Sequence, residues 1–86
     1  MARSNFMKLS IYSLKNVLFQ GEASLLNCKT VTGEITVLEH HDSLITVLSA
    51  GVIKIVDENK KDNYFPVKSG FLEVKPGNEV RCIVEQ

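Results

Sequence analysis

The chain has 86 residues, 44% of them hydrophobic, and its ten basic and ten acidic residues give a formal net charge of zero. This length allows one domain, residues 1–86, and leaves little room for a large internal cavity. The neutral balance argues against nucleic-acid binding and against steering toward an anionic membrane, and no uncharged run approaches the roughly 20 residues that span a bilayer. Because the N-terminus has no hydrophobic signal core, we expect a cytoplasmic protein.

Short alternating apolar runs predict strands in the first half of the chain. Leu9 and Ile11 alternate with polar neighbours, and this period of two indicates a half-buried strand. Leu26 and Cys28 are likewise expected to point inward, with Asn27 between them pointing outward. The strands predicted here are residues 8–13, 17–19 and 23–31, with a break at residues 20–21.

Turn-forming residues divide the second half into further short strands. Residues 58–63 have hairpin composition. Pro66 lies inside the next run, which indicates an edge strand because Pro cannot donate to a ladder. Residues 75–78, Lys-Pro-Gly-Asn, are the strongest turn signal, and another turn is expected at residues 69–70. The strands predicted here are residues 44–48, 52–57, 64–68, 71–74 and 80–84.

The pattern of the whole chain indicates the fold class. No segment keeps apolar residues at the helical spacing i, i+3, i+4 and i+7 for long enough to form a convincing helix. Many short strands, with turns about every 8–12 residues, are typical of antiparallel sandwiches and barrels. We therefore predict an all-β protein, a flattened antiparallel β-sandwich of about ten short strands.

Residues 32–43 connect two apolar runs and carry a dense group of ionisable side chains. Gly33 offers a turn, because glycine takes positive φ without steric cost. Metal binding by residues 39–42, Glu-His-His-Asp, is disfavoured, since adjacent residues of an extended chain point to opposite faces. Catalysis by Ser43 or a cysteine beside His41 lacks any sign of an oxyanion hole. We predict no catalytic, metal or cofactor site.

The two cysteines, Cys28 and Cys82, lie in separate apolar runs. Their spacing fits neither a CxxC redox motif nor a zinc site. We expect two buried, reduced thiols in a reducing compartment, with a disulfide between the two strands as the alternative.

Residue types alone leave two roles open for the polar residues of the central segment. His41 is either an exposed loop residue or part of a protein contact surface. Glu34 is either a turn residue or a contact residue. Composition does not separate these roles.

Several short motifs follow one another in a specific order from Lys8 onward. They are F-x-G at 19–21, G-E at 33–34, His41, Leu44, Thr46, G-V-I at 51–53, S-G at 69–70, L-E-V at 72–74 and P-G-N at 76–78. In this order they resemble the N-terminal sandwich domain of the ATP synthase epsilon subunit, called delta in mitochondria. The chain departs from the family pattern at residues 38–43, where the family's Y-P-G-H-A-P becomes L-E-H-H-D-S and only His41 matches. Phe71 also stands where the family has the second glycine of S-G-G.

The resemblance implies a non-catalytic subunit of the central stalk. Such a subunit binds gamma and the polar loops of the membrane c-ring, and it helps to couple ion translocation to ATP synthesis. Carried over, Ser13, His41 and Thr46 match positions that face gamma, and Glu34 matches the position that faces the c-ring loops. The resemblance further implies a peripheral location at the cytoplasmic face of the membrane, without direct insertion. We expect the isolated chain to be a monomer.

Most members of this family continue after the sandwich into a hairpin of two helices. This sequence ends at Gln86, where that hairpin would begin, so we expect the hairpin to be absent. Two other functions stay open: a free-standing sandwich adaptor for another cytoplasmic partner, and a small enzyme or metal protein built on His40 and His41.

Overall fold

A computed structural model describes residues 6–86, and these residues form eight β-strands. None of the described residues belongs to a helix long and apolar enough to cross a membrane. The strands are β1 (Met7–Tyr12), β2 (Val17–Thr30), β3 (Gly33–Leu38), β4 (Leu44–Leu48), β5 (Gly51–Asp57), β6 (Asp62–Val67), β7 (Ser69–Lys75) and β8 (Glu79–Glu85).

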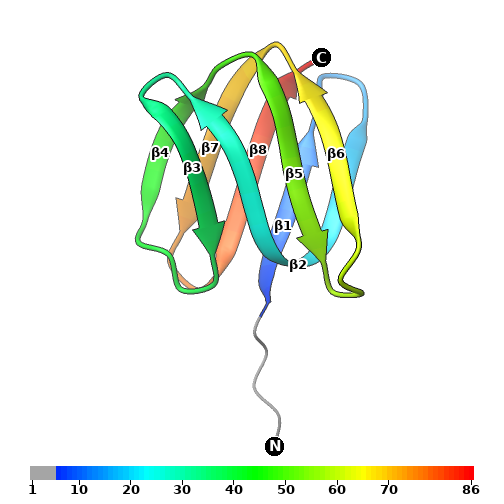
Figure 1. Cartoon of the computed structure of the whole chain (residues 1–86), viewed down its shortest axis with the longest axis vertical. Coiled ribbons are helices and arrows are strands. Elements are labelled where there is room, and N and C mark those ends of the chain that lie inside the picture. The colour runs from blue at the N-terminus through cyan, green and yellow to red at the C-terminus, as the bar shows by residue number, and fades with distance from the viewer. Residues whose placement is uncertain (1–5) are drawn as a thin grey trace, which may run out of the picture.

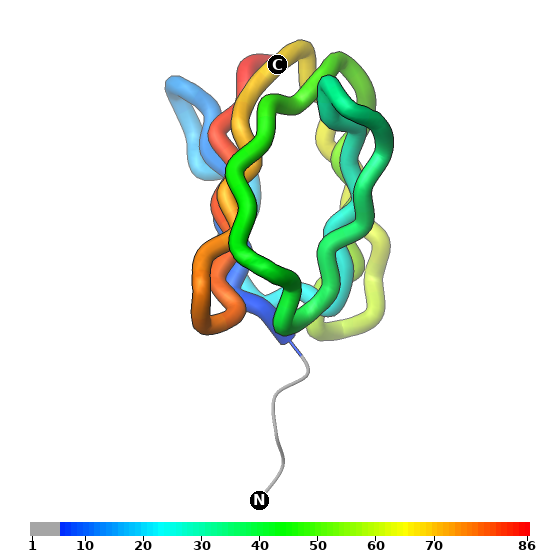
Figure 2. Tube along the Cα trace, turned by 90° about the vertical axis from the view of Figure 1, so that its left-hand side faces the viewer, coloured from blue at the N-terminus to red at the C-terminus, as the bar shows by residue number. Residues whose placement is uncertain are grey.

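The strands form two layers that pack face to face (Figure 1) (Figure 2). One layer contains β1, β8, β7 and β4, and the other contains β3, β2, β5 and β6. Strand β2 joins the two layers, because its first half pairs with β1 and its second half pairs with β3 and β5. A register shift between Ala23 and Leu25 marks the change. The predicted all-β sandwich is confirmed, although β1 and β8 are parallel while the other pairs are antiparallel.

The number of strands was overestimated: the described residues form eight strands, whereas about ten were expected. The expected break at residues 20–21 does not exist, because these residues pair with β1 and join residues 17–19 to residues 23–30 in one strand. The expected turn at residues 69–70 is the start of β7, since Gly70 pairs with both β4 and β8. A Gly can extend a strand as well as end one, and pairing partners far along the chain decide which occurs.

The central segment 32–43 is also more regular than expected. Gly33 has a φ of 129° at the turn after β2, as its residue type indicated. However, the chain then pairs with β2 as far as Leu38, so about half of the segment that was expected to be a connection forms strand β3. The irregular part is confined to residues 39–43.

Two predicted hairpin features are confirmed. Pro66 lies in β6, the last strand of its layer. The turn between β5 and β6 is closed by the Asp57 carboxylate, whose Oδ1 accepts the backbone N–H groups of Asn59 at 2.8 Å and of Lys61 at 3.0 Å. Because these bonds favour the charged form, they hold the pKa of Asp57 below its usual value, with the Lys61 bond contributing most.

The core lies between the layers and draws on every strand. Buried and more exposed side chains alternate along β1 and β8, as a period of two requires. Leu26 and Cys28 point inward, as predicted from their spacing. The buried apolar side chains are Met7, Leu9, Ile11, Ala23, Leu26, Cys28, Val37, Leu48, Ile53, Ile55, Val67, Leu72, Val74, Val80, Cys82 and Val84.

Both cysteines are free and buried, so the expectation of two reduced thiols is confirmed and the disulfide alternative is not. Burial raises the pKa of Cys28 to about 11, with a smaller contribution from the negative charge of Glu34. Burial also raises the pKa of Cys82 to about 12. The thiolate is the reactive form, and at neutral pH both side chains are almost entirely protonated.

Gly70 is required by a close approach of two strands. A Cβ atom at this position would lie 2.3 Å from the backbone oxygen of Ile83 and 2.9 Å from the Cα of Val84. Backbone atoms in the middle of a sheet cannot move aside cheaply. A side chain here would therefore push β7 away from β8.

We expect the Gly70→Ala variant to lose about 2 kcal/mol of unfolding free energy, a usual cost of overpacking. For a domain of this size that loss lowers the Tm by roughly 10 °C. The matched control is Gly21→Ala, because the nearest atom to a Cβ there is the Phe19 ring at 3.8 Å. Equal Tm values for the two variants in thermal denaturation would contradict this account of Gly70.

We expect both thiols to resist a thiol reagent in the folded protein at pH 7.4 and to react within seconds in denaturant. The physical reason is that the buried, protonated thiols must wait for the protein to open. Time-resolved labelling followed by mass spectrometry measures both rates. Rapid labelling of native Cys28 or Cys82 would show that the layers separate more easily than the packing implies.

Candidate partner-binding surfaces

The structure does not gather the four predicted contact residues in one place. Ser13 lies in the β1–β2 connection and Glu34 near the start of β3. His41 lies in the loop between β3 and β4, and Thr46 lies in the middle of β4. The β1–β2 connection and the β3–β4 loop are at opposite ends of the sandwich (Figure 1). Glu34, His41 and Thr46 belong to three consecutive segments, namely β3, the β3–β4 loop and β4, whereas Ser13 lies apart from them.

Ser13 forms hydrogen bonds within the β1–β2 connection. Its backbone N–H donates to the Asn16 oxygen at 2.8 Å, and its Oγ accepts the Asn16 N–H at 3.1 Å. The Lys15 N–H also approaches this Oγ at 3.4 Å. These bonds explain the serine structurally, because a short side-chain acceptor closes a tight connection. The tip of the same turn carries Leu14, which is 94% exposed.

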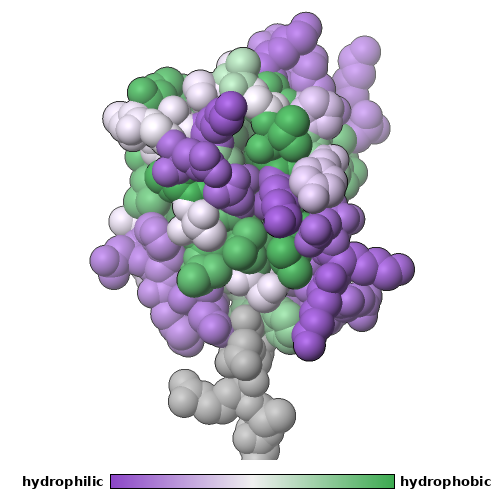
Figure 3. Space-filling view, viewed as in Figure 1, coloured by the Kyte–Doolittle hydropathy of each residue, from purple (hydrophilic) through white to green (hydrophobic). Residues whose placement is uncertain are grey.

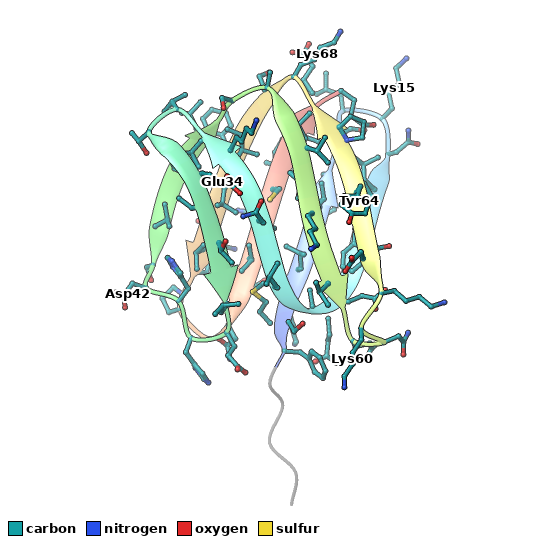
Figure 4. The ribbon with its side chains drawn as sticks, viewed as in Figure 1. Lys15, Glu34, Asp42, Lys60, Tyr64 and Lys68 are labelled. Atoms are coloured by element: carbon teal, nitrogen blue, oxygen red, sulfur yellow. The ribbon has the colours of Figure 1, made fainter. Side chains whose placement is uncertain are left out.

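Glu34 is exposed, as expected for a residue outside the core (Figure 4). It is opposite Lys29 in the β2–β3 register. Yet the ion pairs within 4 Å found in residues 6–86 involve other residues, so the carboxylate of Glu34 is not neutralised by a close cation. An exposed carboxylate without a close cation is available to a cation on another protein.

The β3–β4 loop is exposed but tied to the sandwich. The Nδ1 atom of His41 lies 2.8 Å from the backbone oxygen of Asp42, to which it donates when protonated there. His40 has a φ of 61°, and its backbone N–H donates to Oδ1 of Asn78. The backbone oxygen of Asn78 accepts the Lys8 N–H at 2.8 Å. Among the described residues no group of three or more acidic, histidine or cysteine side chains is placed to hold a metal ion.

Asn78 is a residue whose role the sequence did not reveal. The motif P-G-N indicated a turn, and Gly77 and Asn78 indeed have φ values of 85° and 61°. The amide side chain also anchors the β3–β4 loop, 38 residues away in sequence. No local pattern signals a contact at that separation.

Thr46 lies on the inner side of β4. The strand alternates, so Thr46 shares its side with Leu44 and Leu48, while Ile45 and Val47 point outward. Thr46 is half-buried and is opposite the fully buried Leu72 of β7. Its hydroxyl therefore lies at the open margin of the core and not on the outer face of the layer.

The outer face of β4, β7 and β8 carries a group of exposed apolar side chains, here called the β4–β7–β8 patch. Its members are Ile45, Val47, Phe71 and Ile83, with exposed fractions of 73%, 44%, 56% and 48%. Val47 pairs with Phe71, which pairs with Ile83, so these three form one row across three strands. The sequence held a signal for this patch, because residues 44–48 are apolar on both sides of the strand, which is typical of a strand covered on both faces.

A charged pair borders the patch. Arg81 Nη2 donates to Glu73 Oε1 at 2.8 Å, and both side chains are partly exposed. The hydrogen bond to Glu73, together with its negative charge, raises the pKa of Arg81. The two residues line a shallow depression of about 200 Å³ with Ile45, Phe71 and Ile83. The surface is thus apolar in its centre and charged at its margin.

The outer face of the other layer is a mixture of hydrophilic and hydrophobic side chains, as the space-filling view shows (Figure 3). Leu38 and Val52 are about half exposed there. Lys54 and Asp62 lie on the same face and approach to 3.9 Å. Tyr64, which pairs with Lys54, is 59% exposed. Polar groups therefore separate the apolar ones on this face, in contrast to the β4–β7–β8 patch.

The sequence is similar to known proteins over almost its entire length. Residues 6–86 match the family described as "ATP synthase, Delta/Epsilon chain, beta-sandwich domain". The chain is 34% identical over 70 residues, 81% of its length, to an ATP synthase epsilon chain from Hydrogenovibrio crunogenus, of which it covers 48%. The chain spans about half the length of the curated relatives it matches.

Solved structures share the fold. All of this chain superimposes on 54% of a chain in the Euglena gracilis mitochondrial ATP synthase, with a TM-score of 0.90 and 18% identity. It also superimposes on 67% of a chain in the central stalk and c-ring of the Tetrahymena thermophila mitochondrial ATP synthase, with a TM-score of 0.78 and 17% identity. The family match over residues 6–86 is what decides membership: the chain belongs to the ATP synthase delta/epsilon family, as its β-sandwich domain.

Proposed function

We propose that this chain is a non-catalytic central-stalk subunit of a rotary F-type ATP synthase. It binds the gamma subunit and the c-ring and helps to couple ion translocation to ATP synthesis. Family membership over residues 6–86 supports the assignment. The single structural observation that carries it is the β4–β7–β8 patch, because a contiguous exposed apolar surface with a charged margin is typical of a protein–protein interface.

We assign the gamma contact to the patch and to the segments beside it. His41 directly precedes β4, the strand that carries two patch residues, and the Thr46 hydroxyl lies at the open margin beside the patch, so we assign both residues to the edge of this contact. Ser13 belongs to the β1–β2 connection, which lies at the other end of the sandwich (Figure 1). A partner that touches both Ser13 and His41 must therefore run along the length of the strands.

We assign the c-ring contact to Glu34. An exposed carboxylate without a close cation attracts a basic group on the polar loops of a membrane ring, and such pairs set orientation and association rate. With this contact, we infer that the chain lies at the cytoplasmic face of the membrane as a peripheral subunit of the complex, without insertion into the bilayer.

The architecture suits a part that transmits torque. A rotor element must not shear when one side is held and the other is driven. Strand β2 is shared by both layers, so hydrogen bonds of one continuous strand tie the layers together. Closely packed cores also deform little.

We expect Phe71→Ala to weaken binding to purified gamma subunit at least tenfold, because exposed aromatic anchors at the centre of an interface dominate binding. The matched control is Tyr64→Ala on the opposite face, because Tyr64 is also aromatic and is 59% exposed, against 56% for Phe71. Calorimetry of the two variants measures the effect, with Tm values to confirm folding. Equal affinities would show that the patch does not contact gamma, and absence of binding by the unaltered chain would favour the adaptor hypothesis.

We expect Glu34→Lys to keep the Tm, since surface changes usually stay within about 0.5 kcal/mol, and to reduce retention by a gamma–c-ring preparation. His41→Ala should act in the same direction but more weakly, because its loop departs from the family pattern. Glu58→Lys, which reverses a charge at an exposed turn, is the control. Unchanged retention with a large drop in Tm would show instead that Glu34 holds the sandwich together.

A further inference from the structure

Strand β3 is an edge strand whose outer side has no partner among residues 6–86. It pairs with β2 on one side, through all six of its residues, and with no other strand. Strand β4, which follows it in the chain, belongs to the other layer and pairs with β2 only where Leu48 is opposite Thr30. No strand lies between β3 and β4, so the two border a side of the sandwich, here called the open side, that no strand covers (Figure 2).

The free backbone groups of β3 can be identified from the pairing. Lys29 of β2 directs its carbonyl away from β3, because this oxygen accepts the Ser49 N–H at 3.0 Å. Antiparallel strands alternate between hydrogen-bonded and non-hydrogen-bonded pairs, so the Lys29–Glu34 pair is non-hydrogen-bonded. The same alternation turns the N–H and C=O groups of Glu34, Thr36 and Leu38 toward the open side. All three residues are exposed.

The opposite edge of this layer is interrupted at one position, Pro66, and β3 has no such interruption. In β6 the backbone of Pro66 lacks an N–H, and its oxygen accepts a hydrogen bond from Gln86 Nε2 at 3.1 Å. The Asp57 N–H donates to the Lys61 oxygen, so these two residues form a hydrogen-bonded pair of the β5–β6 hairpin. Because such pairs alternate with non-hydrogen-bonded ones, Pro66 falls in a non-hydrogen-bonded pair with Val52, and its nitrogen points away from β5. Strand β3 contains neither Pro nor Lys, and its pairing with β2 is continuous, without a bulge. An edge without these devices is a template for another strand.

We propose that β3 accepts an extended segment of the gamma subunit as an added strand, which bonds to the backbones of Glu34, Thr36 and Leu38. This inference rests on the proposed function and adds the mode of contact. The site is continuous with the gamma surface assigned above, since β4 borders the open side and carries Ile45 and Val47 of the patch. Backbone pairing supplies affinity, and alternate side chains supply specificity.

The neighbouring side chains define the chemistry of the added strand. Its inward positions would lie beside Ile35 and Val37, which pack on the core, so these positions require apolar residues. Its outward positions would lie beside Glu34 and Thr36, whose side chains lie on the outer face of the layer, so the Glu34 carboxylate stays available for the c-ring contact while the backbone of the same residue pairs with gamma. Glu39 follows β3 directly, so this end of the edge favours a basic residue on the added strand.

Charge also disfavours a second copy of this chain as the occupant. Residues 33–39 contain two glutamates and no lysine or arginine, so a second β3 would bring no basic residue to the acidic end of this edge. A basic segment of another protein would supply one.

Hydrogen exchange of the unaltered chain, followed by NMR, tests the proposal. In the free protein the amides of Glu34, Thr36 and Leu38 should exchange rapidly, because they have no acceptor. With purified gamma subunit in excess they should exchange at least tenfold more slowly. If gamma binds and these three amides stay unprotected, strand addition is overturned while the proposed function stands.

A backbone variant provides the second test. Thr36→Pro removes the central donor of the edge, and Pro66 shows that this sandwich accepts a proline in an edge strand. The control is Thr36→Val, which loses the same hydroxyl, a hydrogen-bond partner of Asn27 Nδ2 at 2.9 Å, but keeps the N–H. We expect the proline variant to bind gamma at least tenfold more weakly than the valine variant.

The possible outcomes distinguish strand addition at β3 from the proposed binding to gamma. Equal affinity of the folded Thr36→Pro and Thr36→Val variants would overturn strand addition. If Thr36→Pro does not fold, the exchange experiment on the unaltered chain decides. Loss of binding by Phe71→Ala with no effect of Thr36→Pro would keep the gamma partner and reject the edge. Failure of the unaltered chain to bind gamma at all would overturn both.

Discussion

The structure depends on a single strand that belongs to both layers. Strand β2 is 14 residues long, and it pairs with β1 before the register shift at Ala23–Leu25 and with β3 and β5 after it. A sandwich without such a strand would be held mainly by side-chain packing. Here the backbone hydrogen bonds of one strand also resist the sliding of one layer over the other. The remaining edges, β3 and β4 on one side and β6 on the other, follow from the way β2 divides its pairing.

This division explains why the two faces and the two edges of the sandwich differ. The layer of β1, β8, β7 and β4 carries the apolar patch on its outer face, while the outer face of the other layer is interrupted by polar groups. The β6 edge is interrupted by Pro66, while the β3 edge is uninterrupted. Both unprotected features meet at β4, which has the patch on one side and the open margin on the other. A partner bound along β4 would bury the apolar patch and also provide hydrogen-bond partners for the free backbone groups of β3.

Local patterns were sufficient for the class of fold and for much of the core. The alternation of Leu26 and Cys28, the proline of β6 and the turn at residues 75–78 each indicated the structure that formed, because each acts within a few residues. The patterns were insufficient where distant pairing decides, as at residues 20–21 and at Gly70. The candidate surfaces show the same limit. Exposure of Glu34 and His41 was predictable from their polarity, but the inward side of Thr46 and the anchoring role of Asn78 depend on which strands lie opposite.

The most direct test of the central claim is a cryo-EM structure of this chain bound to the gamma subunit. The account predicts that gamma covers the outer face of β4, β7 and β8, with Phe71 buried, and leaves the outer face around Tyr64 in solvent. A complex in which gamma covers the Tyr64 face and leaves Phe71 exposed would contradict it.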